Sequence, residues 1–354
     1  MEIRPIKKSE WEKLRAFNAE MYSPTHVLTN PDYYNWQFDS PFNKDKSAYS
    51  SLGLFKRDEL VGTIGAFSVP CSISGKPVNC NWMANLIVRP ELRALGYGYL
   101  LMKEAAKGFD LVVDHNINTQ TWPMFIKAGY KGGDINRYVC VLNQENVRRL
   151  IGKEGIVLSA TKSENSSPDI RELKRFDEDF SELWKRVKER YGVTIDRGNA
   201  YMNWRYADCK VVNYRILATY SGSDMVALAV LRVDEITEGP DKHPANIRIG
   251  RIIDFISDEK SEDRMTAGIV RFCREANIDL IDFFSTGQFG IPAFEQNGFV
   301  NSDQEPHSLI PTLLNPIDRV KRTRHNFAYF INSQNIDGAM LSDLNNWYTT
   351  KGCG

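Results

Sequence analysis

The pattern of residues 86–102 predicts a buried strand, a turn and the start of a helix, with Gly96 and Gly98 where the helix begins. Glycines at such a junction let backbone N–H groups approach a ligand closely. Together with the partial positive charge of a helix N-terminus, these amides would form a cradle suited to a pyrophosphate. A glycine-rich helix start that binds nothing is the simpler alternative.

Two common nucleotide-binding motifs do not match this segment. A dinucleotide fingerprint needs a third glycine, and Leu101 stands at that position. A P-loop needs Gly-Lys followed by Ser or Thr, which the segment lacks. The cradle, if it is one, therefore serves another phosphate-bearing ligand.

A second polar group follows the next buried strand, where Asp114, His115 and Asn116 are consecutive. An imidazole has an ordinary pKa suited to accepting a proton from an amine, so His115 is a candidate general base. Asp114 is a candidate to orient that imidazole or to take the proton itself. Structural roles for both residues stay open.

The elements that position these groups recur along the chain. Three segment pairs appear in the same order at a nearly constant spacing of 168 or 169 residues, which predicts duplication of a whole domain. The pairs are residues 33–38 with 201–206, the strand ending at Asp114 with the strand ending at Asp282, and residues 125–130 with 294–299.

Each half alternates strand and helix patterns, so we expect an α/β fold with a mixed, mostly antiparallel twisted sheet flanked by helices. A polar, Ser-rich stretch at 157–169 is the expected boundary. The predicted domains are residues 1–158, with the cradle, and residues 169–354. Residues 351–354 are expected to form a frayed tail.

Composition excludes several classes of protein. The chain has 45 basic and 45 acidic residues, and this balance argues against a nucleic-acid or membrane-surface binder. No apolar run is long enough to span a membrane, and no signal peptide is evident. Six scattered cysteines predict reduced thiols, without a disulfide framework or metal site. We therefore expect a cytoplasmic protein.

The segment Val88 to Gly98 resembles the acetyl-CoA signature of the GNAT acyltransferase superfamily, a strand followed by Arg/Gln-x-x-Gly-x-Gly/Ala and a helix. Downstream, Asn118 and the Phe125–Tyr130 segment resemble the later GNAT helix and its closing glycine. With the repeat, the resemblance implies two tandem GNAT-like domains. The Tyr-x-x-Trp element of each half is similar to tandem-GNAT enzymes that acylate nucleotide-linked amino sugars for surface polysaccharides.

The resemblance implies acyl-CoA, either acetyl-CoA or another short acyl-CoA, as the co-substrate. Backbone groups of the strand would hold the pantetheine arm, amides of the turn would hold the pyrophosphate, and Asn118 would lie near the pantetheine. The implied binding residues are Leu86, Ile87, Val88, Arg93, Ala94, Leu95, Gly96, Tyr97, Gly98, Tyr99 and Asn118.

The sequence also departs from the family pattern. Phe125 stands where many relatives carry the tyrosine that protonates the leaving thiolate. Ala84 and Asn85 stand where relatives often carry a carboxylate, just before Leu86. Asn85 therefore joins His115 and Asp114 as a candidate catalytic residue. Residues 259–264 of the second half contain no glycine and several acids, so that half is expected to lack CoA binding.

The resemblance implies an N-acyltransferase that moves an acyl group from acyl-CoA to a primary amine, and a nucleotide-linked amino sugar of surface-polysaccharide biosynthesis is the acceptor that we expect. We expect a monomer or simple homodimer that needs no metal, nucleic acid or membrane. Two alternatives stay open. One is a non-catalytic acyl-CoA-binding module, and the other is a GNAT enzyme that acts on a protein or small-molecule amine.

Overall fold

The computed structural model describes residues 1–153, 155–158, 170–238, 244–312 and 325–353. Its strands are β1 (Glu2–Lys7), β2 (Ala48–Lys56), β3 (Glu59–Ile73), β4 (Lys76–Val88), β5 (Leu111–His115), β6 (Lys131–Val141), β7 (Ile170–Leu173), β8 (Val193–Ile195), β9 (Tyr214–Ser221), β10 (Asp224–Glu238), β11 (Pro244–Ser257), β12 (Leu280–Ser285), β13 (Val300–Asn301), β14 (His325–Ile331) and β15 (Trp347–Tyr348).

Helices connect and cover these strands. They are α1 (Trp11–Met21), α2 (Pro31–Phe38), α3 (Pro90–Arg93), α4 (Tyr97–Ala105), α5 (Trp122–Lys127), α6 (Gln144–Ile151), α7 (Glu178–Val187), α8 (Asn199–Met202), α9 (Glu262–Glu275), α10 (Ile291–Gln296) and α11 (Gly338–Ser342), with shorter turns that include η2 (Val27–Thr29), the π-turn η4 (Asn203–Ala207) and η9 (Lys351–Cys353). None of the helices among the described residues is long and apolar enough to cross a membrane.

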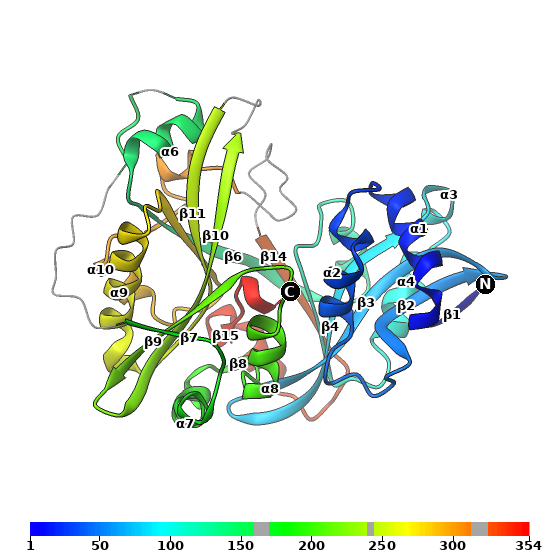
Figure 1. Cartoon of the computed structure of the whole chain (residues 1–354). Helices are drawn as coiled ribbons and strands as arrows, with labels where there is room; N and C mark the ends of the chain where they lie inside the picture. Colours follow the sequence, from blue (N-terminus) through cyan, green and yellow to red (C-terminus); the bar gives the residue numbers. More distant parts are fainter. Residues whose placement is uncertain (154, 159–169, 239–243, 313–324, 354) are drawn as a thin grey trace.

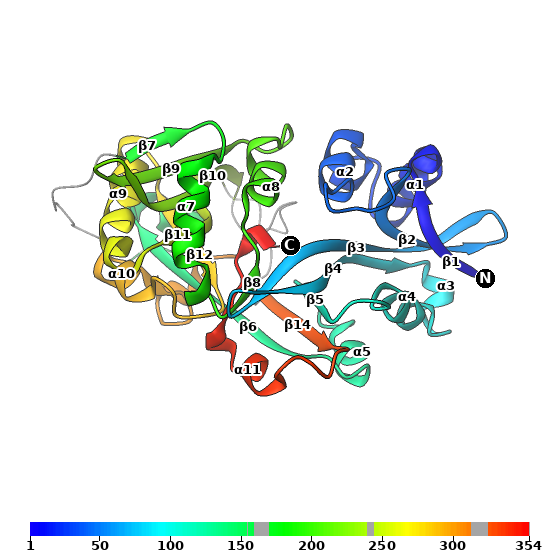
Figure 2. The same ribbon diagram turned by 90° about the horizontal axis from the view of Figure 1, so that it is seen from below.

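Most strands join one sheet in the order β1-β2-β3-β4-β5-β14-β6-β12-β11-β10-β9-β7 (Figure 1). Neighbouring strands are antiparallel except for β4 with β5 and β11 with β12 on this path. In the first half, α1 and α2 cover one face of the sheet and α4 and α5 cover the other (Figure 2). The predicted fold class, a mostly antiparallel twisted sheet flanked by helices, is confirmed.

Apolar side chains on both faces of the sheet hold these layers together. On the α2 face, the rings of Phe38 and Phe67 stack with centroids 5.0 Å apart. On the α4 face, Leu101 and Met102 are buried in the same cluster as Met83. Burying a large apolar side chain stabilises a fold by about 1.5–3 kcal/mol, so both helix layers are fixed against the sheet.

The two halves of the chain exchange strands at the centre of the sheet. β14 belongs to the C-terminal part, yet it lies between β5 and β6 and pairs Phe327 with His115. β6 continues from β14 to β12, where Val139 pairs with Asp282. The predicted boundary at 157–169 lies mostly outside the described residues. The division into residues 1–158 and 169–354 therefore stays a prediction, and the strand pairing crosses it.

The repeat is visible in the packing of the two halves. Trp36 Nε1 donates to the Trp204 carbonyl at 3.2 Å, and Trp204 Nε1 donates back to the Trp36 carbonyl at 3.0 Å. Gly129 and Gly298 both have positive φ and both end a short helix with the same turn bonds. Both pairs agree with the predicted repeat, and the division into two tandem GNAT-like domains stays a prediction.

The predicted match of Asp114 with Asp282 is wrong by one residue. The parallel ladder of the first half ends at Met83 paired with Asp114, and that of the second half ends at Ile252 paired with Phe283. Equivalent positions are therefore 169 residues apart here, and Asp114 corresponds to Phe283. A shift of one residue in a strand turns the side chain to the opposite face of the sheet, so the two aspartates have different surroundings.

The C-terminal segment is packed into the second half, and the expected frayed tail is wrong for residues up to Gly352. Phe255, the counterpart of Leu86, donates its amide to the Tyr348 hydroxyl at 2.9 Å. Thr349 and Thr350 are buried, and Gly352 accepts a bond from Tyr201. This segment fills the part of the second half that corresponds to the ligand-binding face of the first.

Candidate functional site

A slot opens in the first half where two parallel strands separate. β4 pairs with β5 only as far as Met83, although it stays paired with β3 as far as Val88. An irregular register between β3 and β4 and the positive φ of Asn85 mark a bulge at the point of separation. Bulges bend a strand and free its edge. Beyond this point, the β4 edge facing β5 is open for a ligand.

The start of α4 forms one wall of this slot. Gly96 caps the helix with φ of 78°, a conformation that favours glycine. The first helical bond joins the Leu100 amide to the Gly96 carbonyl, so the amides of Tyr97, Gly98 and Tyr99 precede the helical ladder. Across the slot, a Cβ on Gly98 would lie 3.7 Å from the sulfur of Met124 on α5. The wall is therefore shaped for close approach of an anion.

The slot is about 430 Å³ in volume and collects most of the predicted CoA-binding residues. Ala94, Leu95 and Tyr97 do not contribute to its lining, and the Leu95 side chain is 64% exposed. The predicted residues that line it are Leu86, Ile87, Val88, Arg93, Gly96, Gly98, Tyr99 and Asn118.

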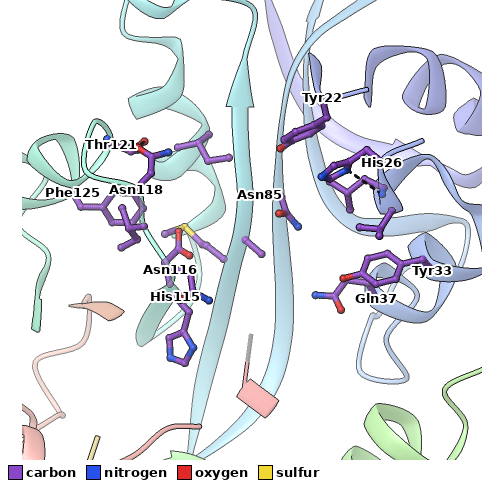
Figure 3. Close-up of a pocket in the computed structure, with 17 residues that line it drawn as sticks. Tyr22, His26, Tyr33, Gln37, Asn85, His115, Asn116, Asn118, Thr121 and Phe125 are labelled. Carbon is purple, nitrogen blue, oxygen red and sulfur yellow. Dashed lines mark hydrogen bonds between the residues drawn. The ribbon is translucent and has the colours of Figure 1, made fainter. Parts of the chain in front are cut away.

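A second cavity of about 390 Å³, here called the acceptor cavity, continues from the inner end of the slot. The slot and the acceptor cavity share Tyr22, Leu86, Asn118 and Thr121. Figure 3 shows polar side chains from two sides of this space, with Tyr22 and His26 facing Asn118 and Thr121 across the strand that carries Asn85. A ligand in the slot therefore meets the acceptor cavity at this junction.

The cavity contains all three predicted catalytic residues, Asn85, Asp114 and His115. Asp114 is 5% exposed, and burial raises the pKa of its carboxyl well above its usual range. The carboxyl therefore keeps its proton to higher pH than an exposed aspartate does. In this state Asp114 is a hydrogen-bond donor and can give a proton, whereas a base must take one.

His115 is shifted in the opposite direction. Its ring lies edge-on to Trp82 with centroids 4.6 Å apart, and Nε2 is buried with no hydrogen-bond partner. Burial lowers its pKa to about 3. The imidazole is therefore neutral at physiological pH and weakly basic. The role of His115 as general base stays a prediction, as do those of Asp114 and Asn85.

Sequence reasoning missed the wall formed by α1, η2 and α2. Tyr22, His26, Tyr33 and Gln37 line the cavity from this side. Tyr22 and His26 belong to no motif, whereas Tyr33 and Gln37 lie in the repeated segment 33–38, which the sequence did not assign to the site. Only the fold brings this wall over the bulge at Asn85. The hydrophobic pattern of α1 was the available signal, because a helix packed on this face must place its C-terminal end near the slot.

Tyr22 stands where the slot and the acceptor cavity meet. Its ring stacks on His26 with centroids 4.3 Å apart. The residue is 37% exposed, and the burial of its remaining surface raises its pKa to about 12. His26 Nδ1 accepts the Leu28 amide at 3.3 Å, and burial lowers the pKa of His26. Tyr22 therefore keeps its hydroxyl proton at physiological pH and can donate it, while its ring packs on that of His26.

The comparisons with known proteins agree with this geometry. A family model described as an acetyltransferase (GNAT) domain matches residues 2–109, which include the strand–turn–helix segment of the slot. No curated protein matches the sequence.

Solved structures of similar fold cover both halves. N-myristoyltransferase of Saccharomyces cerevisiae with bound myristoyl-CoA has a TM-score of 0.60 at 15% identity, over 93% of this chain and 78% of that chain. A GCN5-related N-acetyltransferase from Anabaena variabilis has a TM-score of 0.58 at 11% identity, over 93% and 72%. A probable N-acyltransferase from Enterococcus faecalis has a TM-score of 0.56 at 13% identity, over 93% and 72%.

The chain thus has the GNAT fold over most of its length and a GNAT acetyltransferase domain at its N-terminal end. The slot fits acyl-CoA, because the open β4 edge suits an amide-bearing arm and the amides at Gly98 suit a pyrophosphate. This protein is a CoA-dependent acyltransferase, and acyl-CoA is its co-substrate.

Proposed function

We propose that this protein transfers an acyl group from acyl-CoA to a primary amine, and that the acceptor is a nucleotide-linked amino sugar of surface-polysaccharide biosynthesis. The observation that carries the proposal is the junction between the slot and the acceptor cavity, where both are lined by Tyr22, Leu86, Asn118 and Thr121. Two substrates held on either side of this junction would have their reacting atoms close together.

The wall of the acceptor cavity favours a neutral amine. Asp114 is the one carboxyl group among its described lining residues, and burial raises its pKa, which disfavours the charged carboxylate. The wall therefore favours the nucleophilic free base of an amine over an ammonium ion. The side-chain amides of Gln37, Asn85 and Asn116 are suited to the hydroxyl groups of a sugar.

The reaction needs two proton movements as the amine nitrogen bonds to the acyl carbon and the C–S bond breaks. Acyl-CoA supplies the activated thioester. The thiolate must gain a proton, and Tyr22 carries one at the junction. The amine must lose a proton, which His115 or water accepts. Tyr22→Phe should lower kcat at least about tenfold with the KM for acyl-CoA nearly unchanged. An unchanged kcat would remove Tyr22 from this role.

The decisive experiment measures CoA release with acetyl-CoA and a panel of amines. The panel contains nucleotide-linked amino sugars, free amino sugars and lysine peptides. The proposal expects the highest kcat/KM with a nucleotide-linked amino sugar and mass-spectrometric detection of its amide. Preference for a peptide would replace the acceptor. Acyl-CoA binding without turnover on any amine would leave a non-catalytic binding module.

A further inference from the structure

A group of basic side chains lies in the second half, where β10 and β11 pair Arg232 with Arg251. This basic cluster consists of Arg232 on β10, Arg251 on β11 and Lys351 on η9. Arg251 Nη1 lies 2.6 Å from Asp282, and Arg232 Nε lies 2.8 Å from Asp234. Arg251 also contacts Asp234 closely.

The carboxylates do not balance these cations. Asp234 is shared by Arg232 and Arg251, and Asp282 is shared by Arg251 and Arg137. Lys351 forms no ion pair with the residues that the structure describes, and its Nζ lies 4.2 Å from the centre of the Phe284 ring.

Two further observations favour another anion at the cluster, because within the described ranges one donor lacks a partner and the charged form of Lys351 lacks a counter-ion. Arg251 Nη2 is buried without a hydrogen-bond partner among the described residues. Burial, and after it the neighbouring Arg251 guanidinium, lower the pKa of Lys351 well below its usual range. Buried cations in proteins are normally paired, and a bound anion would satisfy both groups.

The basic cluster borders the acceptor cavity at two places. At α2, Arg205 of the second half donates to Gln37 Oε1 at 2.8 Å, and the charges of Arg205 and Arg232 both act on Tyr33. Gln37 and Tyr33 line the cavity. At β14, the Phe284 ring that Lys351 contacts lies 4.2 Å from the ring of His325, and His325 Nδ1 bonds to the cavity residue Asn116. The basic cluster therefore adjoins residues that line the acceptor cavity on the side of the second half.

We propose that the basic cluster is a phosphate-binding subsite that holds the phosphate of the acceptor while its amine lies in the acceptor cavity. The subsite rests on the proposed function for its substrate, and it gives the second half a role in acceptor binding. Basic side chains are the common protein partners of phosphate oxygens, and such charge-assisted bonds are stronger than neutral ones.

The test uses the full chain and the variants Lys351→Met and Arg232→Gln. The control is Lys185→Met, an exposed lysine of α7 that pairs with Glu182 at 2.6 Å. With saturating CoA present to fill the slot, inorganic pyrophosphate is titrated in a thermal-shift assay against sodium acetate of equal ionic strength. Wild type and control should be stabilised by pyrophosphate beyond acetate, and both cluster variants should lose this extra stabilisation.

The kinetic arm compares a nucleotide-linked amino sugar with the corresponding free amino sugar. Each cluster variant should raise the KM of the phosphate-bearing acceptor by about tenfold or more, and change that of the free sugar by less than about twofold. Equal pyrophosphate stabilisation in all four proteins would overturn the subsite. Arg232 is partly exposed, so Arg232→Gln decides if Lys351→Met does not fold.

The two proposals fail separately. If wild type acylates no amine, the proposed function fails, while the pyrophosphate titration still decides the subsite. If wild type acylates amines and the cluster variants match the control in both arms, the subsite fails and the acyltransferase assignment stands.

Discussion

Asp114 and His115 are neighbours on β5, yet burial moves their pKa values in opposite directions. Desolvation disfavours whichever form is charged, so it raises the pKa of a carboxyl and lowers that of an imidazole. Burial therefore favours the neutral form of each residue, the carboxylic acid of Asp114 and the uncharged imidazole of His115. A charge-relay arrangement, in which a carboxylate orients an imidazolium, does not describe this pair.

A general base usually shows two effects, a loss of kcat when it is substituted and a loss of activity when pH falls below its pKa. The low pKa of His115 should leave only the first of these in the ordinary pH range. His115→Gln should lower kcat at least about tenfold if the imidazole accepts the amine proton. Because its pKa is about 3, the base form persists at all higher pH, so wild-type activity should not fall as pH decreases through 6.5. The measurement is kcat from pH 5 to 9. An unchanged kcat would exclude His115 as the base.

Asp114 makes folding stability depend on pH. The folded protein keeps a proton that the unfolded chain releases near the ordinary value of 3.8, so stability falls as pH rises above 3.8 toward the raised pKa. The slope is at most about 1.4 kcal/mol per pH unit. Asp114→Asn has no such proton. The unfolding free energy of this variant, measured in urea, should therefore rise relative to that of wild type between pH 5 and pH 7. Parallel curves would contradict the burial of a neutral carboxyl.

At the scale of elements, the strand–turn–helix segment makes a prediction about steric access to the slot. Gly98→Ala adds a Cβ at ordinary contact distance from Met124, whereas Gly98→Leu adds a side chain that enters the slot. We expect CoA to stabilise the Gly98→Ala variant in a thermal-shift assay. The Gly98→Leu variant should bind CoA with an affinity at least about tenfold lower. Circular dichroism checks that the Leu variant is folded. Unimpaired CoA binding by that variant would place CoA elsewhere.

The elements that the sequence predicted well are those fixed by local chemistry. α9, Glu262–Glu275, is an example, because its apolar positions follow helical spacing and Asp258 and Ser261 precede it. The slot residues Leu86 to Val88 and Gly98 were predicted because strand, turn and helix N-terminus are contiguous in sequence. Local secondary structure alone places the residues of a contiguous motif relative to one another.

What the sequence could not predict depends on contacts between distant segments. The strand pattern of β14 is clear, but nothing in it indicates insertion between β5 and β6. Asp114 and Asp282 match when the sequences of the two halves are aligned, although the register of the strand pairs sets them on opposite faces. Tyr22 and His26 belong to no motif and reach the site only through the packing of α1.

At the scale of the whole molecule, the second half retains the fold and loses the slot. Asp254, the counterpart of Asn85, is committed to a buried ion pair with Arg197 at 2.8 Å. Tyr348 bonds to the backbone of Phe255, where the first half leaves an open strand edge. The C-terminal segment thus takes the place that a ligand would have, and one molecule has one slot among its described residues.

The tryptophan pair joins the halves next to the acceptor cavity, since α2 carries Trp36 together with the cavity residues Tyr33 and Gln37. Trp36→Phe and Trp204→Phe each remove one indole hydrogen bond, worth about 0.5–1.5 kcal/mol of unfolding free energy. We expect each variant to lose about that much stability in urea unfolding, and the double variant to lose less than the sum, because both bonds fix the same contact.

The pair should also affect catalysis through the position of α2. If Trp36→Phe loosens α2, the acceptor KM rises severalfold while the KM for acyl-CoA stays constant, because no slot residue lies on α2. Trp184→Phe is the matched control, since it also removes one indole hydrogen bond, from Trp184 Nε1 to Asp196 at 2.6 Å, within the second half. It should lose stability and keep its acceptor KM. Equal changes in both KM values for Trp36→Phe would mean that the contact between the halves supports the whole site, and that the second half does not act through the acceptor cavity alone.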